Sequence, residues 1–218
     1  MKNSNYQKTI NWYEENAKKY AKNSNKYSSI DFTQLIEFSK LFLSKGKILD
    51  AGCGSGRDTR LFDQIGFDVI GIDISKNLLD YAKKTFPNLN FQFGDILNIP
   101  FDDNHFDGVW AHASVVHFDQ DSQVKKALSE FHRVLKPNGL LHLLVRAQKD
   151  NIKTSVSVDS ISEHERYYVN FSKEEIKNII IDTEFKIENQ LQYNESDLDK
   201  NKRPGEGIEW ILNIASKY

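Results

Sequence analysis

The fold is decided by the stretch Ile48-Leu49-Asp50-Ala51-Gly52-Cys53-Gly54-Ser55-Gly56-Arg57, which joins a short apolar strand to a glycine-rich turn that opens a helix. Glycines at alternate positions let the backbone pass close to a ligand, and the N–H groups at a helix start attract an anionic group. About twenty residues further on, the apolar strand Val69-Ile70-Gly71-Ile72-Asp73 ends in a carboxylate, the spacing that places an acid against ribose hydroxyls in a βαβ unit. A nucleotide-like ligand is therefore the first hypothesis.

The spacing of the glycines indicates which nucleotide is expected. Dinucleotide folds of the NAD type need G-x-G-x-x-G, whereas Gly56 comes one position early, and the phosphate loop G-x-x-x-x-G-K-[ST] is absent. A pyrophosphate at this turn would also be repelled by the carboxylate of Asp50 at the end of the strand. A nicotinamide-dependent oxidoreductase remains an alternative only if the glycine spacing misleads.

Strands and helices alternate along the chain in the manner of an α/β fold, and the short connections predict parallel strands. The expected elements are helix 5–22, a helix with Asp31 as N-cap that stops near Gly46, strand 47–52, helix 56–65 closed by Gly66, strand 68–73, helix 75–86 capped by Ser75, strands 90–95 and 106–111, helix 121–135, a turn at 136–139, strand 140–145, a helix opened by Ser172 and Glu175, and strands 185–193 and 208–216. A polar loop containing Arg203-Pro204-Gly205 predicts an antiparallel return between the last two strands.

Composition favours a single domain with small additions. The 218 residues can form one sizeable core, and a net charge of −2 with both signs well mixed gives no field that favours nucleic acid or an anionic membrane. Cys53 is the sole cysteine, so an intramolecular disulfide is excluded, and it is expected to be a small packing residue rather than a nucleophile. No N-terminal apolar run indicates export or a membrane span, so a cytoplasmic location is expected. No metal is expected, because no metal-ligand spacing links His105, His132, His142 and His164.

Further motifs follow the glycine turn in order, namely Gly71-Ile72-Asp73-Ile74-Ser75, Gly94-Asp95-Ile96, Phe106-Asp107-Gly108-Val109-Trp110-Ala111-His112 and Leu135-Lys136-Pro137-Asn138-Gly139. From about Lys47 to Tyr218 the chain resembles the class I S-adenosylmethionine-dependent methyltransferases, in particular their small-molecule branch. The resemblance implies a Rossmann-like doubly wound sheet of seven strands, mostly parallel, with an antiparallel seventh strand beside the fifth. The fourth-strand motif departs from the Asn/Asp-Pro-Pro-Tyr pattern of many enzymes that methylate the amines of bases, which counts against a DNA substrate.

The resemblance also implies the residues that would bind S-adenosylmethionine. Gly52 and Gly54, together with Gly56 of the same motif, would lie along the methionine part, Asp50 would orient its ammonium group, and Asp73 would accept both ribose hydroxyls. At the adenine, Ile74 would cover one face, Asp95 would accept from the amino group and the Ile96 N–H would donate to the ring. Two further residues are expected to contact the methionine part. Arg57 would pair with its carboxylate, and the backbone carbonyl of Ala111 would accept a hydrogen bond from its ammonium group.

Methyl transfer is an in-line displacement, so the protein mainly aligns the reactants and excludes water. A base is needed only where the nucleophile must lose a proton, and His112 is the first expected base and His117 the second. Substrate selection is expected from what the common core leaves over, with Tyr13 and Tyr20 in the first helix and Arg146, Arg166 and Tyr168 in the segment 146–170. Arginines and tyrosines together suit an anionic or planar substrate, although a packing helix and a solvated lid would have the same composition.

The sequence therefore predicts a methyltransferase with a helical lid or extension over residues 1–45 and a cofactor-binding domain over residues 46–218, in which 146–170 is a substrate-side insertion. S-adenosylmethionine is the expected cofactor, a small molecule the expected partner, and neither DNA nor a membrane is expected. A non-catalytic cofactor-binding sensor or partner subunit and an RNA methyltransferase are the alternatives. The methyl acceptor and the oligomeric state are left open.

Overall fold

The computed structural model describes residues 4–24, 29–158, 165–198 and 207–218, so His164 and the loop Arg203-Pro204-Gly205 of the sequence analysis lie outside the described residues. The strands are β1 (Lys47–Ala51), β2 (Asp68–Asp73), β3 (Asn90–Phe93), β4 (Phe106–His112), β5 (Leu135–Ala147), β6 (Thr154–Val158), β7 (Glu165–Phe171), β8 (Phe185–Asn194) and β9 (Glu209–Lys217). The helices are α1 (Asn5–Ser24), α2 (Ser29–Ser39), α3 (Arg57–Gln64), α4 (Lys76–Thr85), the 3₁₀ turn η1 (Val115–His117), α5 (Asp121–Val134), α6 (Lys173–Asp182) and α7 (Glu195–Leu198).

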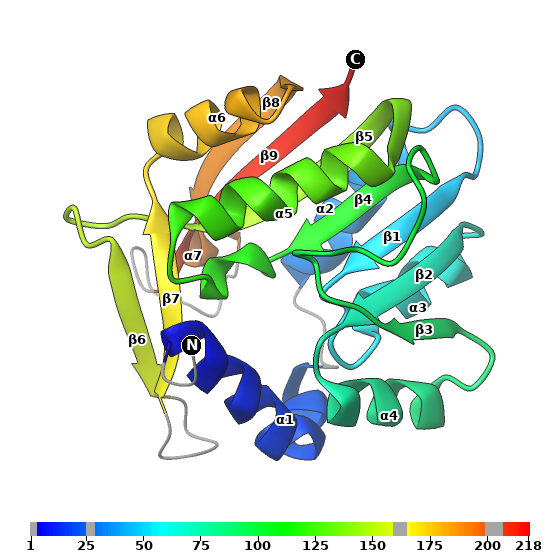
Figure 1. The fold of residues 1–218 in the computed structure, drawn as a ribbon, viewed down its shortest axis with the longest axis horizontal. Helices are drawn as coiled ribbons and strands as arrows, with labels where there is room; N and C mark the ends of the chain where they lie inside the picture. The colour runs from blue at the N-terminus through cyan, green and yellow to red at the C-terminus, as the bar shows by residue number, and fades with distance from the viewer. Residues whose placement is uncertain (1–3, 25–28, 159–164, 199–206) are drawn as a thin grey trace.

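The described strands form one nine-stranded sheet in the order β3-β2-β1-β4-β5-β7-β6, with β9 paired to β5 and β8. Strands β1 to β5 pair in parallel, whereas β9 runs antiparallel to both of its neighbours. Helices α5 and α6 lie on one face of the sheet, and α2 and α3 lie on the other (Figure 1). The predicted doubly wound α/β fold, with its antiparallel last strand beside β5, is confirmed.

The core has two sides because successive side chains of a strand point to opposite faces of the sheet. In β1, Ile48 packs with Phe38 of α2 and Phe62 of α3, while the next residue, Leu49, belongs to the cluster that contains Phe131 of α5. All are almost completely excluded from solvent. The continuous apolar run of β1, a central parallel strand, therefore packs against the helices on both faces of the sheet.

The glycine turn after β1 is fixed by the end of β2. The N–H groups of Gly52 and Cys53 both donate to the carbonyl of Ile72, each at 2.9 Å. Cys53 packs against Phe91 and other apolar side chains, and burial raises the pKa of its thiol, as suits a packing residue. Gly56 has φ +83, and a Cβ added there would lie 2.5 Å from the Phe91 ring, so this glycine lets α3 begin close against β3.

Segment 146–170 has secondary structure that was not predicted, and two local predictions were wrong. In the segment, β6 and β7 form an antiparallel hairpin, and β7 joins the sheet beside β5 at Arg146, which adds two strands to the seven predicted. The expected turn at 136–139 lies within β5, where the pairing with β4 shifts register and Asn138 has φ +64. Helix α2 begins at Ser29 rather than after Asp31 and ends at Ser39, well before Gly46.

The other predicted helix starts and the tail agree with the structure. Ser75 and Ser172 cap α4 and α6 by accepting from the N–H groups of Leu78 and Glu175, and β8 and β9 form the predicted antiparallel return. Across the ranges that the structure describes, no helix is both long and apolar enough to cross a membrane.

Replacing Gly56 by Ala should destabilise the protein more than replacing Gly66 by Ala. Both glycines have a left-handed backbone, with φ +83 and +92, but only a Cβ at Gly56 collides with a ring, since the nearest atom at Gly66 is Lys45 Cγ at 3.9 Å. The backbone term alone costs about 1–2 kcal/mol, and overpacking adds about 1–3 kcal/mol. Urea unfolding of the two variants measures the difference; equal losses would contradict a packing role for Gly56.

Candidate functional site

A cavity of about 470 Å³ opens at the carboxyl ends of β1, β2 and β4. Ligands of open α/β sheets bind at this edge, where the strand order reverses between neighbouring strands, here β1 and β4. Helix α1 crosses the same edge between α4 and the β6–β7 hairpin (Figure 1). Its residues Thr9, Ile10, Tyr13 and Tyr20 line the cavity, so α1 forms one wall of it.

Helix α1 is anchored to the core at two places. Glu14 Oε2 accepts from the Ser75 hydroxyl at 2.6 Å and from the Asn77 N–H at 3.1 Å, which ties the middle of α1 to the start of α4. The N–H of Tyr6 donates to the two carboxylate oxygens of Asp119 at 3.0 and 3.1 Å, which ties its first turn to the segment after β4. These bonds set the position of α1 relative to the ends of the parallel strands.

Asp73 lies where β2 ends and holds the glycine turn against it. Its Oδ2 accepts from the Gly54 N–H and its Oδ1 from the Ser75 N–H, each at 2.8 Å. Burial raises the pKa of Asp73, and these backbone bonds oppose the rise. Each carboxylate oxygen can accept a second hydrogen bond, so the side chain can still receive two hydroxyl groups from a ligand in the cavity.

A second acidic group lies on the other side of the turn. Asp50 is 3% exposed and accepts from Thr59 Oγ1 at 2.6 Å; burial and the neighbouring charge of Asp58 raise its pKa. Burial also disfavours the charged form of Asp58, but the charge of Arg57 and its hydrogen bonds outweigh burial and lower the Asp58 pKa. Arg57 donates to Asp58 through Nε at 2.7 Å and Nη2 at 3.1 Å, and Trp110 Nε1 donates to the same carboxylate at 2.9 Å. The charge of Arg57 is thus already balanced by its neighbour.

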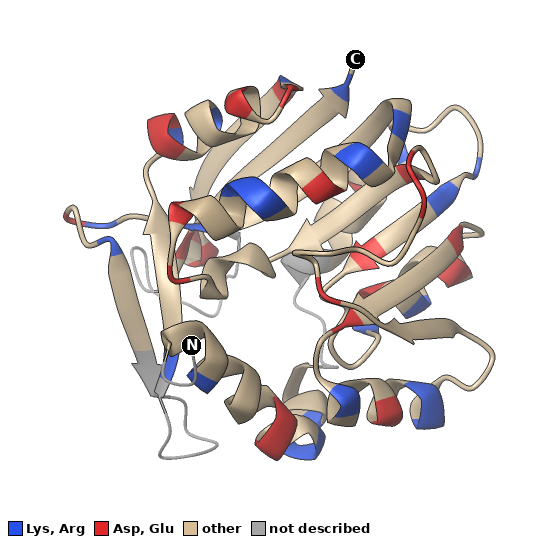
Figure 2. Ribbon diagram, in the orientation of Figure 1, with Lys and Arg blue, Asp and Glu red and all other residues tan. Residues whose placement is uncertain are grey.

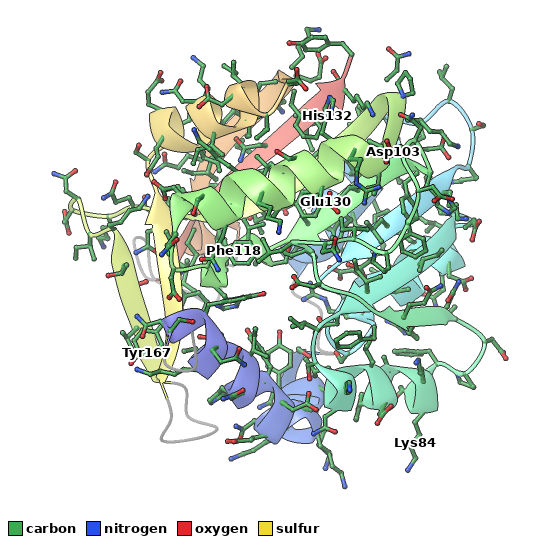
Figure 3. All side chains as sticks on the ribbon, viewed as in Figure 1. Lys84, Asp103, Phe118, Glu130, His132 and Tyr167 are labelled. Carbon is green, nitrogen blue, oxygen red and sulfur yellow. The ribbon has the colours of Figure 1, made fainter. Side chains whose placement is uncertain are left out.

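Asp95 and Ile96 line the cavity beside Asp73. Asp95 Oδ1 accepts from the Leu97 N–H at 2.8 Å, which holds the carboxylate in a tight turn. Tyr6 of α1 lines the same cavity, and burial first and then the charges of Asp95 and Asp73 raise its pKa. Its ring packs on Phe118 with 4.9 Å between centroids, and Figure 3 shows Phe118 directed towards α1.

The two predicted bases follow the end of β4. Ala113, with φ +58, turns the chain from His112 into η1, which ends at His117, and both histidines line the cavity. His112 Nδ1 lies 3.4 Å from Nε2 of the buried His142, with the two rings stacked. The His142 ring also stacks on the ring of Trp110, with 3.6 Å between centroids. The buried core therefore fixes the orientation of the His112 ring.

His117 is held neutral in one tautomer. Burial lowers its pKa to about 4, and the charges of Arg166 and Arg146 act in the same direction. Its Nδ1 lies 2.9 Å from the carbonyl oxygen of Tyr167, which can only accept, so Nδ1 carries the proton. Nε2 is then an acceptor, and the Tyr13 hydroxyl 3.1 Å away donates to it. Figure 3 shows Tyr167 on β7 beside α1.

Arginine and aromatic side chains form the wall opposite the glycine turn. The guanidinium carbon of Arg166 lies 4.6 Å from the centroid of the Trp12 ring, and its Nη1 donates to the Tyr13 hydroxyl at 3.4 Å. Arg146 stacks on Tyr168 at 4.2 Å. Contacts of this kind hold a guanidinium group against the faces of aromatic rings.

Most of the residues predicted for the site are brought together on this cavity. Those on its walls are Asp50, Gly52, Gly54, Arg57, Asp73, Ile74, Asp95, Ile96, His112, His117, Tyr13, Tyr20, Arg166 and Tyr168. Three are not among the lining residues: Gly56 faces Phe91, the Ala111 side chain is fully buried in the core, and Arg146 lies behind Tyr168. In the described part of the chain, no group of three or more His, Cys, Asp and Glu side chains is placed to hold a metal ion.

Some wall residues were not predicted. Tyr193, Glu195 and Trp210 come from the tail, where Trp210 Nε1 donates to Glu195 Oε1 at 2.9 Å. No motif marks them, because they reach the cavity only through the pairing of β8, β9 and β5. Asp58 was missed although it follows Arg57 directly, and the adjacency of opposite charges at a helix start was the available signal.

Comparison with known proteins agrees with this geometry. Residues 49–143 match the family described as "Methyltransferase domain". The methyltransferase GfsG of Streptomyces halstedii is 32% identical over 130 residues, which are 55% of this chain and 46% of that protein. The demethylmenaquinone methyltransferase of Paenarthrobacter aurescens (strain TC1) is 38% identical over 97 residues, 44% of this chain and 36% of that protein. The chain thus spans less than half the length of these curated relatives.

Solved structures share the fold over more of the chain. A SAM-dependent methyltransferase from Methanosarcina mazei superposes with a TM-score of 0.72 at 22% identity, covering 83% of this chain and 96% of that one. The 1,6-didemethyltoxoflavin-N1-methyltransferase of Burkholderia thailandensis was solved with 1,6-didemethyltoxoflavin and S-adenosylhomocysteine. It superposes with a TM-score of 0.60 at 20% identity, covering 79% of this chain and 71% of that one. At such identities the likeness concerns the fold.

The depressed pKa of His117 should make the protein lose stability in mild acid. The unfolded chain takes up a proton near pH 6.5, whereas the folded His117 does so only near pH 4, so stability falls as the pH drops from about 6.5 towards 4. Between pH 7 and pH 5 this group alone should remove about 2 kcal/mol. Urea unfolding at both pH values measures it. His117→Gln, which keeps an amide donor and an acceptor, is the control and should lose less; an equal loss in both proteins would contradict the assignment.

Proposed function

The chain belongs to the class I S-adenosylmethionine-dependent methyltransferases, and from this premise we propose that it transfers the methyl group of S-adenosylmethionine to a small-molecule acceptor. The observation that carries the proposal is the Asp73 carboxylate at the end of β2, locked to the Gly54 N–H and facing the cavity. Such a carboxylate has free lone pairs for two ribose hydroxyls.

The residues present fit this cofactor better than a dinucleotide. Asp50, Asp73 and Asp95 all line the cavity, and acids there favour a ligand with cationic groups and would repel a pyrophosphate. S-adenosylmethionine supplies a methyl group on a sulfonium, together with an ammonium and a carboxylate. Asp50 orients the ammonium, Asp73 binds the ribose, and Asp95 with the N–H of Ile96 recognises the adenine.

The acceptor is expected between η1, α1 and β7. There the Tyr13 oxygen receives a bond from Arg166 and gives its proton to His117 Nε2, so its remaining lone pair can accept an O–H or N–H of the acceptor. That hydrogen bond orients the acceptor, and His112, which lines the same cavity, is the base proposed to take its proton during the attack. His117, the second expected base, holds the Tyr13 hydroxyl in place.

Helix α1 is proposed to act as the lid of the site. Methyl transfer needs the reactants aligned and water kept out, and α1 places Tyr13 and Tyr20 on the wall opposite the core. Tyr20 lies over the glycine turn, with its Cε1 3.9 Å from where a Cβ of Gly54 would be. The anchor of Glu14 on Ser75 would release and reform as ligands pass.

A small molecule is favoured over RNA by the distribution of charge. Acidic and basic residues alternate along α4, α5 and α6 (Figure 2), whereas proteins that follow a nucleic acid backbone usually carry a basic stripe. The cavity volume of about 470 Å³ lies in the range of small-molecule sites.

The proposal is tested by thermal shift with S-adenosylmethionine, S-adenosylhomocysteine, NAD and NADP, each at saturation. A ligand at a hundred times its dissociation constant adds about 2.7 kcal/mol of stability, so the two adenosyl sulfur compounds should raise the unfolding midpoint and the nicotinamide nucleotides should not. A shift with NAD or NADP alone would overturn the assignment.

Asp73→Asn should weaken S-adenosylhomocysteine binding by about 1.5–3 kcal/mol, roughly 10- to 150-fold, because charge-assisted bonds to the ribose are lost. Isothermal titration calorimetry measures the affinity. Asp68→Asn, an exposed acid at the opposite end of β2, is the matched control and should bind as the natural protein does. Unchanged affinity in Asp73→Asn would remove this residue from the site.

A further inference from the structure

We propose that Arg166, on the β6–β7 hairpin, holds the carboxylate of the cofactor's methionine part, the role that the sequence motif suggests for Arg57. The inference rests on the proposed function and deepens it, because it names a binding residue outside the matched family region of residues 49–143. It also makes the hairpin part of the cofactor site.

Arg57 is poorly placed for a second carboxylate. It holds Asp58 with two N–H donors, at 2.7 and 3.1 Å, and Asp58 is further fixed by Trp110 at 2.9 Å. Both residues of the pair are buried or half-buried. A ligand carboxylate brought to Arg57 would meet the negative charge of Asp58 on the same guanidinium, where little solvent screens the repulsion.

Arg166 reaches the same region from the opposite side. Its guanidinium lies within 6.0 Å of the Tyr20 ring centroid, and Tyr20 in turn covers Gly54 of the turn that receives the methionine part. Burial raises the pKa of Tyr20, and the charges of Arg57 and then Arg166 oppose the rise. Arg166 lines the cavity, and its planar fork can meet a carboxylate with two parallel N–H bonds.

The charges of the cavity separate the two ends of the amino acid. The ammonium and the carboxylate are attached to the same carbon, and the turn side presents the carboxylates of Asp58 and Asp73, beside Asp50, whose pKa is raised by burial. The carboxylate therefore faces away from them, towards α1 and β7. On that wall Arg166 and, behind Tyr168, Arg146 contribute positive charge; among the described residues that line it, Glu195 contributes negative charge, with its Oε1 bonded to Trp210.

The test uses S-adenosylmethionine and decarboxylated S-adenosylmethionine, which differ only in the carboxylate, with calorimetric affinities as the readout. Arg166→Gln should bind S-adenosylmethionine about 10- to 100-fold more weakly and leave the affinity for the decarboxylated ligand nearly unchanged. Arg166→Lys, which keeps the charge without the fork, should fall between. The unliganded unfolding midpoint of each variant shows that it is folded.

Arg57→Gln and Arg146→Gln are the matched controls, and neither should lower affinity selectively for the ligand with the carboxylate. The proposal is overturned if Arg166→Gln weakens both ligands equally, if it weakens neither, or if Arg57→Gln shows the selective loss. Failure of the natural protein to bind either ligand would instead overturn the proposed function on which the inference rests.

Discussion

The bond from the Gly54 N–H to the Asp73 carboxylate is the interaction on which the site depends. The same carboxylate receives the Ser75 N–H, so it joins the end of β2, the glycine turn after β1 and the start of α4. A carboxylate is costly to bury unless donors surround it, and two backbone N–H groups at 2.8 Å provide them. The Asp73 side chain therefore both stabilises the glycine turn and offers its remaining lone pairs to hydroxyl groups.

Helix α1 depends on the same corner of the fold. Ser75 caps α4 by accepting from the Leu78 N–H, and its hydroxyl proton goes to Glu14. One hydroxyl thus starts a core helix and positions a helix that precedes the sheet in sequence. Because Asp73 and Ser75 are only two residues apart, a shift at the end of β2 would also move Ser75 and, through Glu14, the middle of α1.

The sequence could predict those parts of the fold whose signals are local. Apolar runs such as Ile48–Ala51 mark buried parallel strands, and the acid and glycines of the turn lie within a few residues of one another. The β6–β7 hairpin could not be read in this way, because Val156 is 48% exposed and its strand is defined by pairing to β7 rather than by burial. Likewise, Glu195 reaches the cavity through strand pairings distant in sequence.

Within the site, the sequence predicted which residues lie near the cavity better than it predicted which side chains bond to one another. The spacing placed Arg57 at the turn but gave no hint that Asp58 takes two of its donors, since that depends on a side-chain conformation. Arg146 and Arg166 were expected to act together, yet Arg166 lines the cavity while Arg146 lies behind Tyr168. Arg146 lies on β5 and Arg166 on β7, so which of the two reaches the cavity depends on the strand pairing, which composition does not show.

Burial of His117 determines whether the Tyr13 hydroxyl presents a hydrogen-bond donor or an acceptor to the cavity. Forming an imidazolium there is costly, because it would lie in a buried site under the charges of Arg166 and Arg146. The neutral ring must give its one proton to the Tyr167 carbonyl, which forces the Tyr13 hydroxyl to donate to the other nitrogen. Tyr13 therefore presents a lone pair, not a proton, to the cavity. This wall therefore accepts a hydrogen bond, and under the proposed function it suits an acceptor molecule whose nucleophilic atom still carries its proton.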